Sequence, residues 1–176
     1  REVSSPMLFN HVMRSYYFAE LCAQRAPGTI DREIVLLSAV LHDLGLTPHA
    51  HGPRRFEIEG ADAARAFASE RGLSDAKAWL VWDTIALHTY DLNLHKQPEA
   101  RLVQLGILPD ITGIGVADMQ RDQVDAVVAV FPRLNCKREF AKLLLDEALP
   151  KPELAAFHPS IMFRHHCVAA IEIPDA

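Results

Sequence analysis

Residues 34–45 read IVLLSAVLHDLG, an almost unbroken apolar run that ends in a histidine, an aspartate, a leucine and a glycine. Apolar side chains occupy every side of this run, so we expect a helix that is buried in the middle of the protein. Gly45 is suited to a C-cap directly after His42 and Asp43. The run therefore predicts a central helix, from about Asp31 to Leu44, that carries two ionisable side chains into the core.

The rest of the chain divides into further helices at its proline and glycine residues. The turn signals fall at intervals that suit helices, and there is no internal repeat or low-complexity tract. Apart from the central helix, we expect helices at about 7–25, 56–71, 74–89, from 99 to beyond Asp110, 121–131, 135–149 and 160–171. This pattern predicts an all-α bundle that forms one domain over residues 1–176, in which helices within 121–172 complete the fold.

Composition and charge exclude several classes of protein. Hydrophobic residues make up 49% of the chain and charged residues 23%, which is ordinary for a globular domain. A net charge of −5 without a basic patch predicts no nucleic-acid partner. No apolar run approaches the roughly 20 residues of a membrane helix. The three cysteines are widely spaced, so we expect free thiols and a cytoplasmic location.

Two imidazoles and two carboxylates fall at inward-facing positions of separate helices. His11 lies on an apolar stripe of the first helix, and Asp110 shares a face with apolar residues of a later one. Together with His42 and Asp43 they form a polar and charged group. Burying such a group in a hydrophobic core is unfavourable unless its charge and hydrogen-bonding capacity are satisfied, and a bound divalent cation is the simplest way to do so. Histidine nitrogen with aspartate oxygen suits zinc, our first expectation, or iron, manganese, cobalt or nickel. We therefore expect one metal ion bound by these four residues.

This arrangement resembles the HD superfamily of metal-dependent hydrolases and lyases, over about residues 8–118. The resemblance rests on His11, on LHDLG at 41–45 and on Asp110. Within the superfamily the chain looks most like the cyanamide hydratase-like branch, through RFE at 55–57 followed by Gly60-Ala61, IALH at 85–88 and DITG at 110–113. That resemblance implies a helical bundle with one catalytic metal, at which activated water adds to the carbon of a small nitrile-like substrate.

Two departures from patterns elsewhere in the superfamily narrow the expectation. Members with two metals often place a further histidine about four residues before the Gly-Ala pair, where this chain has Phe56. Nucleotidase-type members tend to carry a glutamate three residues after the aspartate of the His-Asp pair, where this chain has Leu46. We accordingly expect a mononuclear site rather than a dinuclear or nucleotide-hydrolysing one.

A group that moves a proton or polarises the substrate is also needed, and two residues are candidates for this catalytic role. His88 is the first, because it lies on an inward helix face and its ordinary pKa is close to neutral pH. Glu57 is the second, although a carboxylate at a helix N-terminus also favours the helix dipole without any catalytic role. His49 and His51 fall in a Pro- and Gly-containing loop, where solvated histidines are common.

The sequence thus predicts a metal-dependent enzyme that hydrates or hydrolyses a small molecule. A phosphohydrolase of the same superfamily is the alternative, for which Arg14 and Lys96 are the only basic residues that we can propose. A second alternative is a non-catalytic helical sensor or binding module that the metal stabilises. The partner expected is a small-molecule substrate, without nucleic acid or membrane, and a homo-oligomer is left open.

Overall fold

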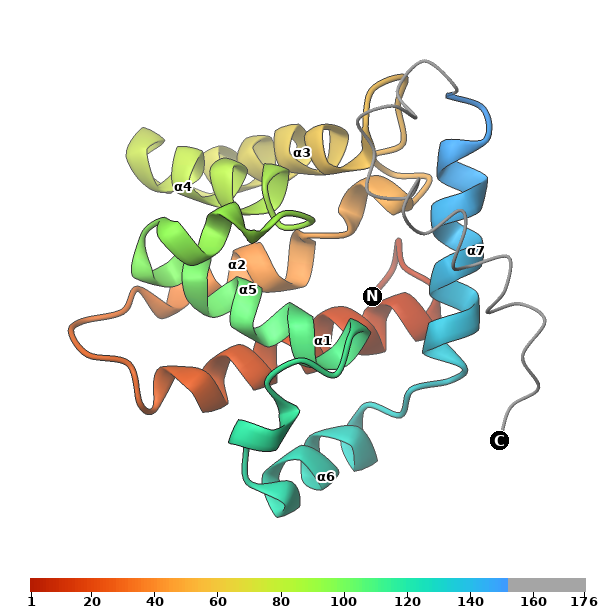
Figure 1. The fold of residues 1–176 in the computed structure, drawn as a ribbon. Coiled ribbons are helices and arrows are strands. Elements are labelled where there is room, and N and C mark those ends of the chain that lie inside the picture. The colour runs from red at the N-terminus through yellow and green to blue at the C-terminus, as the bar shows by residue number, and fades with distance from the viewer. Residues whose placement is uncertain (152–176) are drawn as a thin grey trace.

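The helix that ends at the His-Asp pair lies in the middle of the bundle, as Figure 1 shows. The computed structural model describes residues 1–151, within which the chain is helical and contains no strand. Its elements are α1 (Pro6–Ala23), α2 (Arg32–Leu41), η1 (Leu44–Leu46), α3 (Phe56–Glu70), α4 (Asp75–Ala86), η2 (Asp91–His95), α5 (Pro98–Ile111), η3 (Val116–Asp118), α6 (Arg121–Val130) and α7 (Cys136–Ala148). Helix α2 contacts α1, α3, α4 and α5, so the predicted all-α bundle is confirmed.

Several helices begin at the capping residues that the sequence offers. The Ser5 side chain accepts a hydrogen bond from the backbone of Leu8, and Asp31 accepts from Glu33 and Ile34. Ser74 caps α4 in the same way. Each cap satisfies backbone N–H groups that have no partner inside the helix, which fixes where the helix starts.

The layer formed by α1, α2 and α5 supports one side of the site. Its core contains Ala19, Val35, Ala39 and Val103, which are all fully buried or nearly so. Gly106 permits the close approach of α5 to α1, since a Cβ there would lie 2.2 Å from the carbonyl oxygen of Ser15. Helix α5 therefore runs against α1 closely enough for side chains of the two helices to meet.

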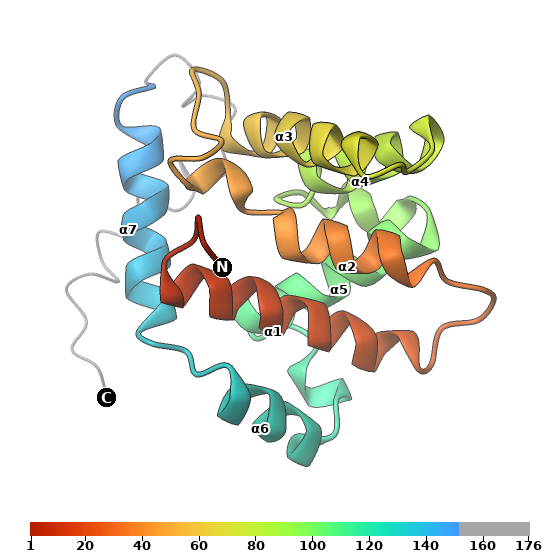
Figure 2. The same ribbon diagram turned by 180° about the vertical axis from the view of Figure 1, so that it is seen from behind.

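The pair α3 and α4 covers another face of α2, and α7 lies at the end of the bundle. Ile34 of α2 packs with Ala61, Val81 and Ile85 in the core beneath α3 and α4. Helix α7 packs against the start of α1 through Cys136 and a small group of apolar residues, and Figure 2 shows it crossing the end of the bundle. No helix among residues 1–151 combines the length and apolarity needed to cross a membrane.

Some element bounds differ from the sequence-based expectation. Helix α2 ends at Leu41, before the His-Asp pair, and the chain continues as the short 3-10 helix η1, so Gly45 is not a C-cap. The central helix is not covered on all sides either, because Leu36 is 40% exposed. Helix α4 ends at Ala86, which places His88 in the following turn rather than on the helix. The predicted helix at 160–171 lies outside the described residues.

Candidate metal centre

The tight turn after α2 brings His42 and Asp43 to the same cavity. His42 is the C-cap residue and keeps helical dihedral angles, whereas Asp43 turns away from the helix. Gly45 allows this turn because its backbone lies directly against the first turn of α3: a Cβ there would be 1.9 Å from the carbonyl oxygen of Phe56. The glycine thus serves a close backbone approach rather than a helix cap.

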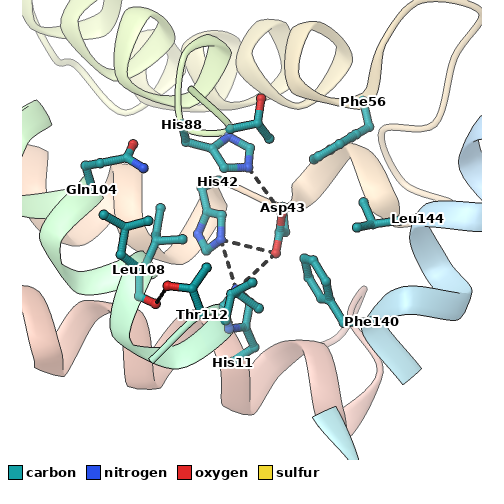
Figure 3. A pocket seen from close by; sticks show the side chains of 13 residues that line it. His11, His42, Asp43, Phe56, His88, Gln104, Leu108, Thr112, Phe140 and Leu144 are labelled. Atoms are coloured by element: carbon teal, nitrogen blue, oxygen red, sulfur yellow. Dashed lines mark hydrogen bonds and ion pairs between the residues drawn. The ribbon is translucent and has the colours of Figure 1, made fainter. Parts of the chain in front are cut away.

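The neighbouring His42 and two histidines from distant parts of the chain, His11 and His88, converge on Asp43, as Figure 3 shows. The Nε2 atoms of His11 and His42 lie 3.2 Å apart, and they lie 3.3 and 3.1 Å from Asp43 Oδ2. His88 approaches from the other side, with Nε2 3.5 Å from Asp43 Oδ1. The four residues are 5% exposed or less. Three imidazoles and one carboxylate therefore meet as buried side chains.

Each imidazole is oriented by a hydrogen bond that its other nitrogen donates outward. Nδ1–H of His42 donates to the carbonyl of Ala39 at 2.8 Å, and Nδ1–H of His88 donates to that of Ile85 at 2.6 Å. A carbonyl oxygen only accepts, so both rings carry a proton on Nδ1. Their Nε2 lone pairs face the cluster, which is the orientation found in metal-binding histidines.

His11 completes the same pattern with a carboxylate in place of a carbonyl. Its Nδ1 lies 2.7 Å from Asp110 Oδ2, which fixes Nδ1 as the protonated nitrogen and leaves Nε2 facing the cluster. Nitrogen and oxygen ligand atoms of His11, His42 and Asp43 all lie within 4.8 Å of one another. The structure therefore brings together three of the four predicted ligands, each with a lone pair aimed at one point.

Asp43 is the clearest indication that a cation belongs at this point. Neither of its carboxylate oxygens accepts a hydrogen bond from the described residues, although both are buried. Burial alone would raise the pKa of Asp43, but in the metal-free protein the adjacent imidazoles, when protonated, outweigh it and hold the pKa well below its usual range. A buried anion without hydrogen bonds is strongly disfavoured unless a positive charge compensates it. The donor set of two imidazole nitrogens and one carboxylate fits zinc or another divalent first-row metal.

Asp110 lies outside this cluster in the structure, so its predicted place among the ligands stays a prediction. It contacts the ring edge of His11 that faces away from His42 and Asp43. Arg14 donates to both of its oxygens at 2.7 Å, and Arg133 donates to Oδ1 at 2.8 Å. These contacts give Asp110 the place of an outer partner that orients His11.

Electrostatics agree with this outer role. Burial opposes ionisation of Asp110, but hydrogen bonds from His11 and Arg14 outweigh it and hold the pKa of the carboxyl far below its usual range. The Arg14 side chain is fully buried and also donates to the carbonyls of Phe131 and Pro132. The guanidinium and the carboxylate thus neutralise each other behind the cluster.

The two predicted catalytic residues have different places. His88 lies at the edge of the cluster and lines the cavity above it. Glu57 is fully buried but does not line the cavity; its carboxylate accepts hydrogen bonds from Arg55 at 2.6 Å and from Thr89 at 2.8 Å. Glu57 therefore supports the turn that holds His88. The loop residue His51 is half exposed and pairs with Glu147 of α7, away from the metal donors.

A cavity of about 160 Å³ opens onto the cluster. Apart from the donors and His88, its walls come mainly from Phe56 of α3, one face of α5, and Phe140 and Leu144 of α7. The contributions of α7 and of Gln104 in α5 had not been predicted. For Gln104 a signal existed, since it lies three and seven residues before the apolar Ile107 and Ile111, whereas nothing in the sequence of α7 marks it as a wall of this cavity.

Comparison with known proteins identifies the family. The family model of the HD domain matches residues 8–106, which is more than half of the chain and includes His11, His42, Asp43 and His88. No curated protein matches the chain. Taken with the all-helical fold and the buried His-Asp cluster, the match shows that this chain belongs to the HD domain family, a superfamily of metal-dependent hydrolases.

Proposed function

We propose that this protein is a metal-dependent enzyme that hydrates or hydrolyses a small uncharged molecule, in the manner of the cyanamide hydratase-like branch. The observation that carries the proposal is the cavity on the cluster. Its walls are mainly aliphatic and aromatic, and neither lysine nor arginine lines it among the described residues. Such a site favours a neutral substrate because an anion would lose its hydration without gaining a partner.

The size of the cavity limits the substrate further. An apolar cavity of about 150 Å³ holds a molecule of the size of benzene. The cavity of about 160 Å³ therefore suits a substrate of roughly six non-hydrogen atoms. A nucleotide, which is several times larger, does not fit this space.

The phosphohydrolase alternative has less support, because a phosphate site needs converging cationic or backbone donors. Arg14 is occupied by Asp110 and by two backbone carbonyls. Lys96 pairs with Asp83 and is 38% exposed. Both basic residues considered from the sequence are thus bound elsewhere.

The residues have distinct roles in the proposal. His11, His42 and Asp43 hold the metal, which supplies, when bound, the Lewis acidity that activates water at neutral pH. Three protein ligands leave a coordination position open, as catalytic sites do and closed structural sites do not. His88 moves the proton between water and substrate, because its Nε2 lone pair faces the same space. Phe56 and Phe140 exclude bulk water from the cavity.

Elemental analysis of the purified protein, followed by assays of cyanamide hydration and phosphomonoester hydrolysis on the same sample, tests this function. We expect about one metal per chain and hydration activity, both lost when His42→Ala and Asp43→Ala are combined. His88→Gln should keep the metal and lower kcat by about 10²- to 10⁴-fold, the usual contribution of a positioned proton-transfer group.

Three outcomes would contradict the proposal in different ways. Metal with phosphatase activity alone would favour the alternative enzyme. Metal with neither activity would favour the non-catalytic module. If His88→Gln lost the metal, His88 would be a ligand rather than a proton carrier.

A further inference from the structure

Besides the metal donor Asp43, one polar side chain in the wall of the cavity makes no hydrogen bond within the described part of the chain. Gln104 is 3% exposed, and its Oε1 is buried without a donor. The two threonines of the wall differ from it: the hydroxyl of Thr112 donates to the carbonyl of Leu108, and that of Thr89 donates to Glu57. Gln104 is thus a buried amide whose hydrogen-bonding capacity is unused.

The place of Gln104 in α5 shows where in the cavity this amide lies. The residues of α5 that line the cavity follow helical spacing along one face: Gln104, Ile107, Leu108, Ile111 and Thr112. Exposure increases along this face, from 3% at Gln104 to an exposed Thr112 about 12 Å farther along the helix. Gln104 therefore lies at the closed end of the cavity, and Thr112 lies at its open end.

The amide end of Gln104 extends toward the side of the cavity formed by His42 and His88, as Figure 3 shows. A substrate held between the metal donors and the closed end would meet this amide. Leaving an amide unpaired in an apolar wall is unfavourable, and an aliphatic side chain of the same length would avoid that loss. The arrangement is explained if a ligand supplies the missing hydrogen bonds, since rotation of the amide presents either its oxygen or its N–H groups.

We propose that Gln104 selects the substrate by pairing with an N–H group on it, so that the substrate class is a small neutral nitrogen compound such as a primary amide, a urea or an amino-substituted nitrile. This inference deepens the proposed function. It rests on that function in one respect, which is that the reaction takes place at the histidine cluster. A neutral partner follows from the lack of a charged side chain at this end of the described wall. An N–H donor follows because Oε1 is the atom of this amide that lacks a partner, and rotation of the amide turns it to the cavity.

The test compares two molecules of the same shape, acetamide and acetone, which differ by an NH₂ in place of a CH₃. Saturation-transfer NMR on the methyl signals, with the full chain with and without added zinc, gives the relative affinities. We expect the wild type to prefer acetamide by about tenfold. Gln104→Met, which keeps the length of the side chain, should abolish the preference. Thr112→Val, which removes a hydroxyl at the open end, should retain it.

Stability separates this role from a structural one. Without ligand, Gln104→Met should have an unchanged or higher Tm, because it replaces an unsatisfied buried amide by an apolar chain. A lower Tm or a failure to fold would show that the amide supports the fold and would overturn the inference. So would a wild type that does not bind acetamide, or a Gln104→Met variant that still prefers it.

The outcome is independent of the proposed reaction. A preference for acetamide that depends on Gln104, in a protein without hydration activity, would support the inference and remove the proposed function. Hydration of cyanamide by a protein that shows no preference for acetamide would support the proposed function and overturn the inference about Gln104.

Discussion

Replacing Asp110 by asparagine distinguishes an outer partner from a metal ligand. In the structure its carboxylate receives hydrogen bonds from His11, Arg14 and Arg133, each at 2.7 or 2.8 Å. Removing an outer partner of a ligating histidine weakens metal affinity by about 10- to 100-fold. We therefore expect Asp110→Asn to bind about one zinc at saturation with that reduced affinity. Asp43→Asn, which removes a donor of the cluster itself, should not reach one zinc.

Isothermal titration with zinc, at a fixed pH and against the same competing chelator, measures both variants. Loss of the carboxylate also leaves the buried Arg14 charge without its partner, which costs about 3–5 kcal/mol. This is a large part of the 5–15 kcal/mol that typically stabilises a domain. The double variant Arg14→Met, Asp110→Asn removes the orphaned charge and serves as the folding control. If that folded double variant bound no zinc, as Asp43→Asn is expected to, the outer role of Asp110 would be refuted.

Three further predictions concern the fold around the site. Gly45→Ala should lower the free energy of unfolding by about 1–3 kcal/mol or more in urea titrations, because the new Cβ meets the backbone of Phe56; Gly52→Ala, which meets only the end of a flexible side chain, should cost less. Burial opposes ionisation of Glu57, but the hydrogen bond from Arg55 outweighs it and lowers its pKa. Because the folded pKa lies below the unfolded value of about 4.3, this contribution is present above that pH and is lost as the pH falls. In metal-free protein, Arg55→Met should therefore reduce the loss of stability between about pH 5 and 3. The same dependence of stability on pH in the variant and the wild type over this range would contradict this. Finally, a chelator should lower the Tm of the purified protein, since zinc at 100 times its Kd adds about 2.7 kcal/mol, and an unchanged Tm would mean that the folded state gains nothing from the metal.

The sequence predicted the parts of the site that depend on local pattern. The apolar run before His42 specified a buried helix, and the stripe that contains His11 gave the correct inward face of α1. Capping residues such as Ser74 located helix starts to within a residue or two. These features depend on spacing within one element, which the sequence displays directly.

Features that depend on how elements meet could not be predicted in this way. Periodicity placed Asp110 on an inward face, but which edge of the His11 ring it contacts depends on the crossing of α5 over α1. The buried Arg14 donates to both oxygens of this carboxylate, and its only signal in the sequence was its position one helical turn after His11. Likewise, Phe140 reaches the cavity only because α7 packs on the start of α1.

The outward hydrogen bonds of the three imidazoles determine which substitutions around the site would disturb the orientation of the rings. His42 and His88 are held in their tautomers by main-chain carbonyls, those of Ala39 and Ile85. A substitution at either carbonyl-bearing position changes a side chain but leaves the acceptor in place. Only the third imidazole relies on a side chain, that of Asp110. The side chains at the first two positions therefore do not set the tautomers, and only their packing in the core limits variation there, whereas a change at Asp110 requires a new partner for its histidine.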